Sequence, residues 1–263
     1  MDVLTPRSLA EALRMKSERP DAAPLAGGTD LMVELNFDRR RPEAILNLAE
    51  VEELRGWSRE NGTVRLGASL TYTEAMEEPL RSLLPALAEA SRTVGSPQIR
   101  NRGTIGGNLG TASPAGDALP PLLVEDAEVE VASVDGERRI ALGDFLVGPK
   151  RNALADDELI AAVHVEPSGA PQTFMKVGPR NAMVIAVCSL ALEVDRERDE
   201  LRAAFGSAAP TVRLVTAPLD QIDGFADQVA GAASPIDDVR GTAAYRRHAL
   251  RVLTARALER CLT

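Results

Sequence analysis

The sequence is short of the residues that bind metals through sulfur and nitrogen. Its 263 residues include two cysteines, Cys188 and Cys261, and two histidines, so it has no CxxC motif and no disulfide framework. An iron–sulfur cluster usually takes four thiolates, which this chain cannot supply. We therefore expect no metal in the chain. Cys188 lies in an apolar segment, and we interpret it as a core residue.

Basic clusters and long apolar runs are also missing. The chain has 30 Lys and Arg against 39 Asp and Glu, a net charge of −9. Nucleic acids and anionic membranes bind clustered positive charge, so both are excluded as partners. No apolar stretch approaches the roughly 20 residues of a membrane span, and residues 1–6 lack the layout of a secretion signal. These absences predict a cytoplasmic protein.

Aromatic residues make up 3% of the chain, so Ala, Val and Leu must fill most of the core. Tyr72 and Trp57 can in principle be ligand platforms, but we interpret each as a partly buried residue at a junction between subdomains. His164 lies in a predicted strand and His248 among arginines, and we interpret them as packed and solvated. No acid–base pair or activated nucleophile is visible, so no catalytic residue is predicted.

The predicted elements follow an α+β order rather than a βαβ alternation. Thr5 and Pro6 predict the start of the first helix. Residues 167–171, rich in Pro and Gly, are the best candidate for a linker. Three strands and then two helices are predicted after it: residues 173–177, 183–192 and 201–205, then 219–230 and 241–262.

Two glycine-rich segments carry the main functional signal. They are Leu25-Ala26-Gly27-Gly28-Thr29-Asp30 and Gly103-Thr104-Ile105-Gly106-Gly107-Asn108, the second continuing to Asp117. Paired glycines let the backbone approach a ligand closely, and successive N–H groups can then bind a phosphate without Lys or Arg. Walker A and Rossmann motifs are both absent. The pair of segments predicts a dinucleotide site, with simple tight turns as the alternative.

These segments resemble the FAD-binding subunit of molybdenum hydroxylases, a family that includes xanthine dehydrogenase and the medium subunit of carbon monoxide dehydrogenase. Residues 26–30 and 104–108 resemble the family's two flavin-diphosphate loops, and residues 111–122 resemble its SPxxDxxP segment. Further similar stretches follow in family order over nearly the whole chain: Leu66-Gly67-Ala68 with Thr71, Phe174-Met175-Lys176, Ser234-Pro235-Ile236-Asp237-Asp238 with Arg240-Gly241, Tyr245-Arg246-Arg247 and Arg256-Ala257-Leu258.

The resemblance implies an α+β protein of the vanillyl-alcohol-oxidase type, also called the PCMH-type FAD-binding fold. Residues 1–168 would form this FAD-binding domain, from two subdomains of about 1–55 and 56–168. Residues 169–263 would form a domain similar to the C-terminal part of carbon monoxide dehydrogenase flavoproteins. A three-stranded antiparallel sheet with helices is expected in that C-terminal domain.

The resemblance also implies a set of cofactor-binding residues. The first segment would wrap the diphosphate, the second would form the opposite wall, and Asp117 would bond the adenosine half through its ribose. Ile160 and Val94 match positions that line the flavin or adenine, and Lys176 matches a lysine near the cofactor. The full set is Leu25, Ala26, Gly27, Gly28, Thr29, Asp30, Val94, Thr104, Ile105, Gly106, Gly107, Asn108, Thr111, Ser113, Asp117, Ile160 and Lys176.

Two positions depart from the family pattern. Val184 stands where relatives often carry an acidic residue, just before Ile185-Ala186. Val94 replaces an aromatic residue that can lie over the isoalloxazine ring in some relatives. Both departures concern the residues that shield the flavin and so control the access of an electron acceptor.

The implied function is electron transfer by non-covalently bound FAD, since no histidine lies beside a glycine segment. A partner subunit would hydroxylate substrate at a molybdopterin, and the [2Fe–2S] clusters of an iron–sulfur subunit would relay electrons to FAD here. NAD⁺ or another acceptor would take them, in a heterotrimer or its dimer. Two alternatives remain open: a self-contained flavin oxidase of related fold, and a non-catalytic interaction module.

Overall fold

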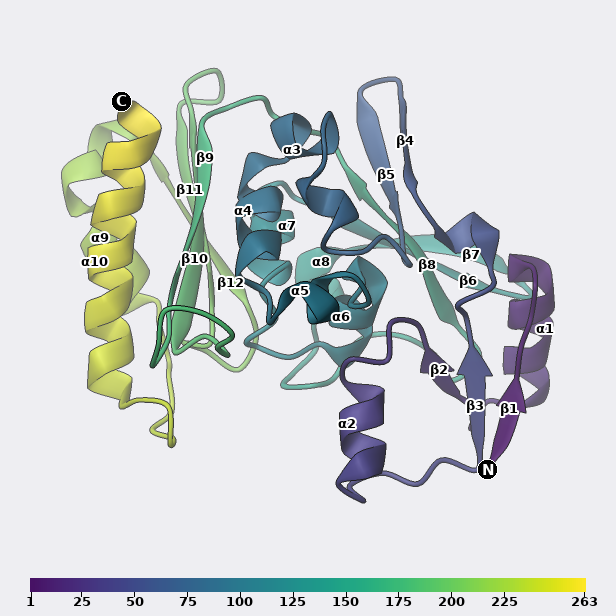
Figure 1. Ribbon diagram of the computed structural model, residues 1–263. Coiled ribbons are helices and arrows are strands. Elements are labelled where there is room, and N and C mark those ends of the chain that lie inside the picture. The colour runs from purple at the N-terminus through teal and green to yellow at the C-terminus, as the bar shows by residue number, and fades with distance from the viewer.

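The computed structural model describes residues 1–263, which form three β-sheets flanked by helices (Figure 1). The N-terminal sheet is parallel, in the order β1-β3-β2. Its elements are β1 Asp2–Leu4, α1 Leu9–Glu18, β2 Ala23–Leu25, α2 Leu31–Asn36 and β3 Ala44–Asn47. The prediction that Thr5 and Pro6 begin α1 is wrong: Ser8 caps the helix, its Oγ accepting from Glu11 N at 3.2 Å.

The central sheet is antiparallel, with five strands in the order β4-β5-β8-β6-β7. Its strands are β4 Trp57–Glu60, β5 Thr63–Gly67, β6 Glu128–Ser133, β7 Gly136–Ala141 and β8 Leu159–Val165. The helical segments around them are η1 Glu52–Leu54, η2 Glu74–Met76, α3 Leu80–Leu83, α4 Pro85–Thr93, α5 Pro97–Arg100, α6 Ile105–Thr111, α7 Leu119–Val124 and α8 Leu142–Phe145.

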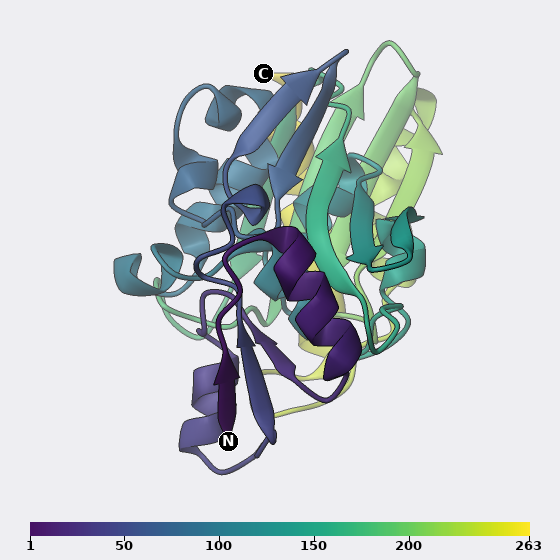
Figure 2. The same cartoon turned by 90° about the vertical axis from the view of Figure 1, so that its right-hand side faces the viewer.

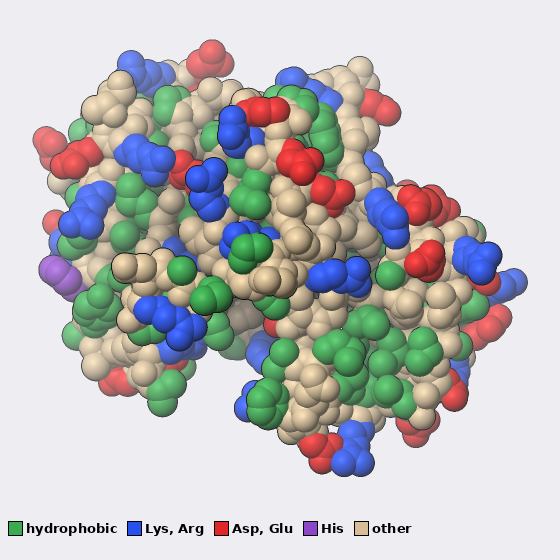
Figure 3. Space-filling model, in the orientation of Figure 1, with side chains coloured by type: hydrophobic (Ala, Val, Ile, Leu, Met, Phe, Trp, Pro, Cys, Tyr) green, Lys and Arg blue, Asp and Glu red, His purple; other side chains and the backbone are tan.

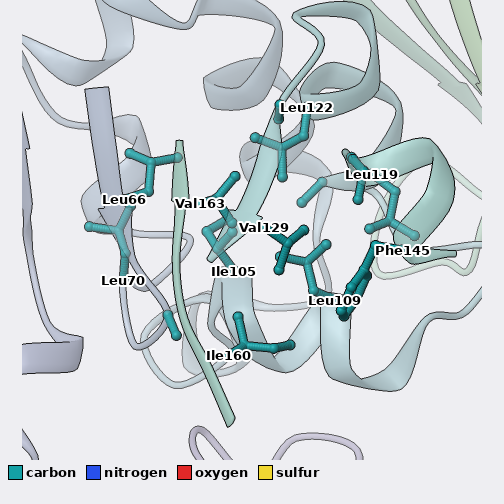
Figure 4. Packing of buried hydrophobic residues seen from close by; sticks show 14 of the residues in the cluster. Leu66, Leu70, Ile105, Leu109, Leu119, Leu122, Val129, Phe145, Ile160 and Val163 are labelled. Atoms are coloured by element: carbon teal, nitrogen blue, oxygen red, sulfur yellow. The ribbon is translucent and has the colours of Figure 1, made fainter. Parts of the chain in front are cut away.

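The core of this part lies between the sheet and α6 and α7. Ile105 and Leu109 of α6 are fully buried and pack toward Val129 and Val163 of the sheet (Figure 4). Phe145 of α8 closes the same cluster. This packing fixes α6, and with it the second glycine-rich segment, against the sheet.

The C-terminal sheet has four antiparallel strands, in the order β12-β11-β10-β9, so the expectation of three strands is corrected. Its elements are β9 Gln172–Val177, β10 Cys188–Asp195, β11 Glu200–Gly206, β12 Arg213–Pro218, η3 Leu219–Gln221, α9 Ile222–Gly231 and α10 Ala243–Leu262. The missed strand, β12, is a partly exposed edge strand that ends in proline, so it lacks a strong apolar pattern. β10 begins at Cys188 rather than at Met183, whose φ is +51°.

Specific hydrogen bonds join the C-terminal sheet to the central part. Glu89 of α4 accepts from Thr173 Oγ1 and from Phe174 N of β9, both at 2.8 Å. Ser207 N donates to Pro114 O at 2.7 Å, so the segment before Asp117 packs on the end of β11. The N-terminal sheet and α10 lie at opposite ends of the molecule (Figures 1 and 2). None of the helices combines the length and apolarity needed to cross a bilayer.

Candidate cofactor-binding site

A cleft of about 450 Å³ lies where the N-terminal sheet meets α6 and β8, a volume within the usual range for small-molecule sites. The surface is hollowed beside α2 in the face shown in Figure 3. Both glycine-rich segments line the cleft, although they lie far apart in the sequence. Its lining residues are Pro24, Leu25, Ala26, Gly27, Gly28, Thr29, Asp30, Leu31, Glu34, Arg40, Leu48, Leu54, Ala68, Ser69, Tyr72, Thr104, Gly106, Gly107, Asn108, Gly110, Thr111, Lys150, Leu154, Glu158, Leu159 and Ile160.

The first segment offers a row of free backbone donors. It connects β2 to α2, and Gly28 turns the chain with φ +78°. None of the N–H groups of residues 26–30 donates a hydrogen bond within the chain. Backbone N–H groups normally find a partner, so consecutive free donors at the edge of a cleft are suited to an anion such as a phosphate.

Close backbone packing holds the two segments together. A Cβ on Gly27 would lie 1.7 Å from Arg102 O, so only glycine fits at this contact. Asp30 adds a second link, because Thr111 Oγ1 donates to its Oδ2 at 2.9 Å. The cleft therefore owes its shape to contacts between residues more than seventy positions apart.

The second segment forms a wall, and the amides of residues 105–108 already donate within the fold. Ile105 N donates to Leu70 O at 2.9 Å, and Gly106 N donates to Ala68 O at 2.8 Å. Gly107 N donates to the capping Thr104 Oγ1 at 3.0 Å. A Cβ on Gly106 would lie 2.6 Å from Ala68 O, so this glycine permits α6 to sit against the end of β5. The structure thus places a row of free amide donors in the first segment only, and in the second segment Thr104 N alone lacks an acceptor within the chain, whereas the sequence suggested a row in both.

The rest of the cleft is apolar inside and charged at its edge. Leu48, Leu54, Leu154, Leu159 and Ile160 form the apolar part, which suits an aromatic ring system. At the charged edge, Glu34 Oε2 lies 3.9 Å from Arg40 Nη1, and Glu34 Oε1 lies 3.8 Å from Lys150 Nζ. All three edge side chains are substantially exposed, so they are free to rearrange around a ligand.

Asp117 and Lys176 form a buried ion pair outside the cleft lining. Lys176 Nζ donates to Asp117 Oδ2 at 2.6 Å, to Thr93 O at 3.0 Å and to Val184 O at 3.3 Å. Burial raises the pKa of Asp117, and the Lys176 ammonium offsets part of that increase. The pair joins the central part to β9 and to the loop after it.

Two oxygen atoms near the second segment are buried without a partner. They are Asp117 Oδ1 and Asn108 Oδ1, and both are hydrogen-bond acceptors. Asn108 is also a cleft-lining residue. Buried acceptors are costly unless a donor reaches them, and no donor within the chain reaches either atom.

The structure brings most of the predicted site residues together. Those that line the cleft are Leu25, Ala26, Gly27, Gly28, Thr29, Asp30, Thr104, Gly106, Gly107, Asn108, Thr111 and Ile160. The others lie outside its lining. Ile105 is a fully buried core residue, and Val94 packs against the same core. Ser113 Oγ accepts from Ala115 N at 3.3 Å within its own turn, and Asp117 and Lys176 pair with each other.

Several cleft residues were not predicted from the sequence. Tyr72 was interpreted as a junction residue, yet it lines the cleft. Leu48, Leu54 and Leu154 come from three separate segments and carry no motif. Lys150 stands in a loop, with φ +55°. Pro24, Leu31, Gly110 and Leu159 each lie next to a predicted residue, so for these four the neighbour marked the site.

The arrangement defines a nucleotide-binding protein of the α+β class, with an anion-binding loop beside an apolar cleft. Residues 1–167 match the family described as the FAD-binding domain in molybdopterin dehydrogenase, and residues 173–261 match the C-terminal domain of carbon monoxide dehydrogenase flavoproteins. The chain therefore belongs to the family of FAD-binding subunits of molybdopterin-dependent dehydrogenases, oxidoreductases that work as complexes.

Individual relatives agree with this assignment. The chain is 31% identical to the xanthine dehydrogenase FAD-binding subunit of Escherichia coli O157:H7, over 95% of this chain and 92% of the relative. It is 37% identical to the nicotinate dehydrogenase FAD-subunit of Eubacterium barkeri, over 74% and 69% of the two chains. A chain of carbon monoxide dehydrogenase from Hydrogenophaga pseudoflava superimposes with a TM-score of 0.92 at 25% identity, covering 100% of this chain and 97% of that one.

Proposed function

We propose that this chain binds FAD in the cleft and acts as the electron-transfer subunit of a molybdenum hydroxylase. Electrons would pass from the [2Fe–2S] clusters of an iron–sulfur subunit through FAD to NAD⁺ or another acceptor, with substrate oxidised on a molybdopterin-binding subunit. We propose that the subunits assemble as a heterotrimer or its dimer. We also propose that the FAD-binding domain has the PCMH-type arrangement of two subdomains. The carrying observation is the row of free N–H groups at residues 26–30.

The residues of this chain fit the cofactor in two respects. The amides of residues 26–30 suit the diphosphate, and the apolar part of the cleft beside Ile160 suits an aromatic ring. Bound FAD supplies the redox chemistry, because a flavin exchanges electrons singly or in pairs.

The protein's own role is to bind and orient. Gly27 keeps the amide row against the second wall, because its contact with Arg102 O leaves no room for a side chain. The Lys176–Asp117 pair fixes the start of α7 relative to β9, and Lys176 also holds the loop after β9 through Val184 O. We propose that Lys176 holds the Asp117 side chain in position and that the pair does not contact the electron acceptor.

Flavin reconstitution of two glycine variants tests the proposal. We expect the purified full chain to bind FAD and to give a yellow protein that NADH reduces when NAD⁺ is the natural acceptor. Gly27→Ala should weaken FAD binding at least about tenfold, because the added Cβ must push the two segments apart.

Gly231→Ala is the matched control, because nothing lies within 4 Å of its added Cβ. Equal FAD affinity of both variants would show that residues 26–30 do not hold the diphosphate. A chain that takes up no FAD would favour an interaction module. Oxidation of a substrate by the isolated flavoprotein, without partner subunits, would favour a self-contained oxidase.

A further inference from the structure

Tyr72 is a buried aromatic residue whose only polar side-chain atom has no partner in the protein. The residue is 5% exposed and lines the cleft. Its hydroxyl makes no hydrogen bond within the chain. Side-chain atoms that lack both a partner and exposed surface do not include this hydroxyl, so its oxygen keeps some exposed surface. The small exposed part of Tyr72 is therefore open to the cleft. A buried tyrosine hydroxyl normally finds a hydrogen-bond partner, and here the cleft is where that partner must lie.

The backbone holds the ring beside the contact between the two glycine-rich segments. Tyr72 N donates to Gly103 O at 3.1 Å, and the ring edge lies 3.1 Å from the position of a Cβ on Gly103. Gly103 in turn lies 3.1 Å from the position of a Cβ on Gly27. Tyr72 is thus packed under the place where the first segment, with its free amides, meets the second.

The phenol has the charge state that an anion-binding donor needs. Burial raises the pKa of Tyr72, and Asp117 and Asp30 raise it further. The hydroxyl therefore keeps its proton at any ordinary pH and can donate it in a hydrogen bond. Such a contact needs no Lys or Arg. The hydroxyl and the free amides of residues 26–30 are alike in being uncharged donors for a phosphate.

We propose that Tyr72 anchors the dinucleotide by donating a hydrogen bond from its hydroxyl to a diphosphate oxygen, where the ligand crosses the contact between Gly27 and Gly103. This inference rests on the proposed FAD function and adds a residue that the glycine motifs do not include. The side chain fits because its ring fills the space under Gly103, while its hydroxyl reaches the cleft.

Tyr72→Phe removes the hydroxyl and keeps the ring, so it tests the contact directly. We expect the dissociation constant of FAD to rise at least fivefold, because a hydrogen bond to a charged group is lost. The full free energy of such a bond corresponds to a rise of about 10- to 100-fold. The thermal unfolding of the FAD-free chain should stay unchanged, because the hydroxyl bonds nothing in the protein. Tyr245→Phe is the control: it alters the other tyrosine of the chain, which is 47% exposed on α10.

ADP, which carries the diphosphate and the adenosine without the flavin, tests whether Tyr72 contacts this half of the cofactor. Tyr72→Phe should weaken ADP binding, measured by displacement of FAD, by the same factor as FAD binding. An effect on FAD of less than fivefold, a loss of stability in the FAD-free variant, or an unchanged affinity for ADP would each overturn the inference. A wild-type chain that binds no FAD would instead overturn the proposed function.

Discussion

Replacing Glu193 by glutamine should make the protein more stable at alkaline pH and leave its stability at acidic pH nearly unchanged. Glu193 lies on β10 and is 1% exposed. Its Oε2 accepts from Ser168 Oγ and from Gln172 Nε2, both at 2.8 Å, and Gln172 Nε2 also donates to Glu125 Oε1. Burial and the nearby Glu125 carboxyl raise the pKa of Glu193 to about 7.

The size and sign of this effect follow from proton linkage. The native carboxyl holds its proton more tightly than the unfolded one, whose pKa is 4.5. Stability is therefore lost as the pH rises from the unfolded pKa through the native pKa of about 7. The difference corresponds to an upper limit of about 3 kcal/mol. Glutamine mimics the protonated form, keeps an acceptor for Ser168 and Gln172, and does not ionise.

Urea unfolding at pH 5 and pH 8 measures the effect. At pH 5, Glu193→Gln and the wild type should have nearly the same free energy of unfolding. At pH 8, the free energy of unfolding of Glu193→Gln should be the higher by about 2–3 kcal/mol. Glu60→Gln, at an exposed strand position, serves as the control for losing one surface carboxylate. If the wild type and Glu193→Gln differ by the same amount at both pH values, the assignment of a proton to Glu193 is wrong.

Two further predictions concern buried polar groups. Asp117→Asn should lower the free energy of unfolding by about 3 kcal/mol, because Lys176 loses its buried partner. The control, Asp227→Asn, loses an exposed pair with Arg251 and should change the free energy of unfolding by less than about 1 kcal/mol. Equal effects of the two variants in urea unfolding would contradict the role of the buried pair. In a Tyr245→Phe chain, which leaves Tyr72 as the only tyrosine, no tyrosinate absorbance should appear before alkaline unfolding, since burial raises the pKa of Tyr72. Tyrosinate in the folded chain near pH 10 would refute this.

The glycine-rich segments were predictable because their function depends on local backbone chemistry. Paired glycines in residues 27–28 and 106–107 mark places where another chain segment or a ligand approaches the backbone closely, and the structure has such contacts at Gly27 and Gly106. The structure also separates two uses of glycine that look alike in sequence. Gly28 supports a loop with free donors, while Gly106 permits helix packing.

The features that the sequence did not reveal are those that tertiary contacts decide. Asp117 and Lys176 are 59 residues apart, and their pairing exists only because the fold brings β9 beside the turn that precedes α7. The strand Arg213–Pro218 carries a weak pattern because it forms an edge. Tyr72 showed no motif, since its place in the cleft follows from its contact with Gly103, thirty-one positions later.

Hydrogen exchange of the backbone amides at residues 26–30 tests the central claim most directly. These N–H groups have no acceptor in the chain, so they should exchange fast in the FAD-free protein. Adding FAD should slow them strongly and should leave the amides of residues 105–108, which already donate within the fold, nearly unaffected. Bound FAD with unchanged exchange at residues 26–30 would contradict the account.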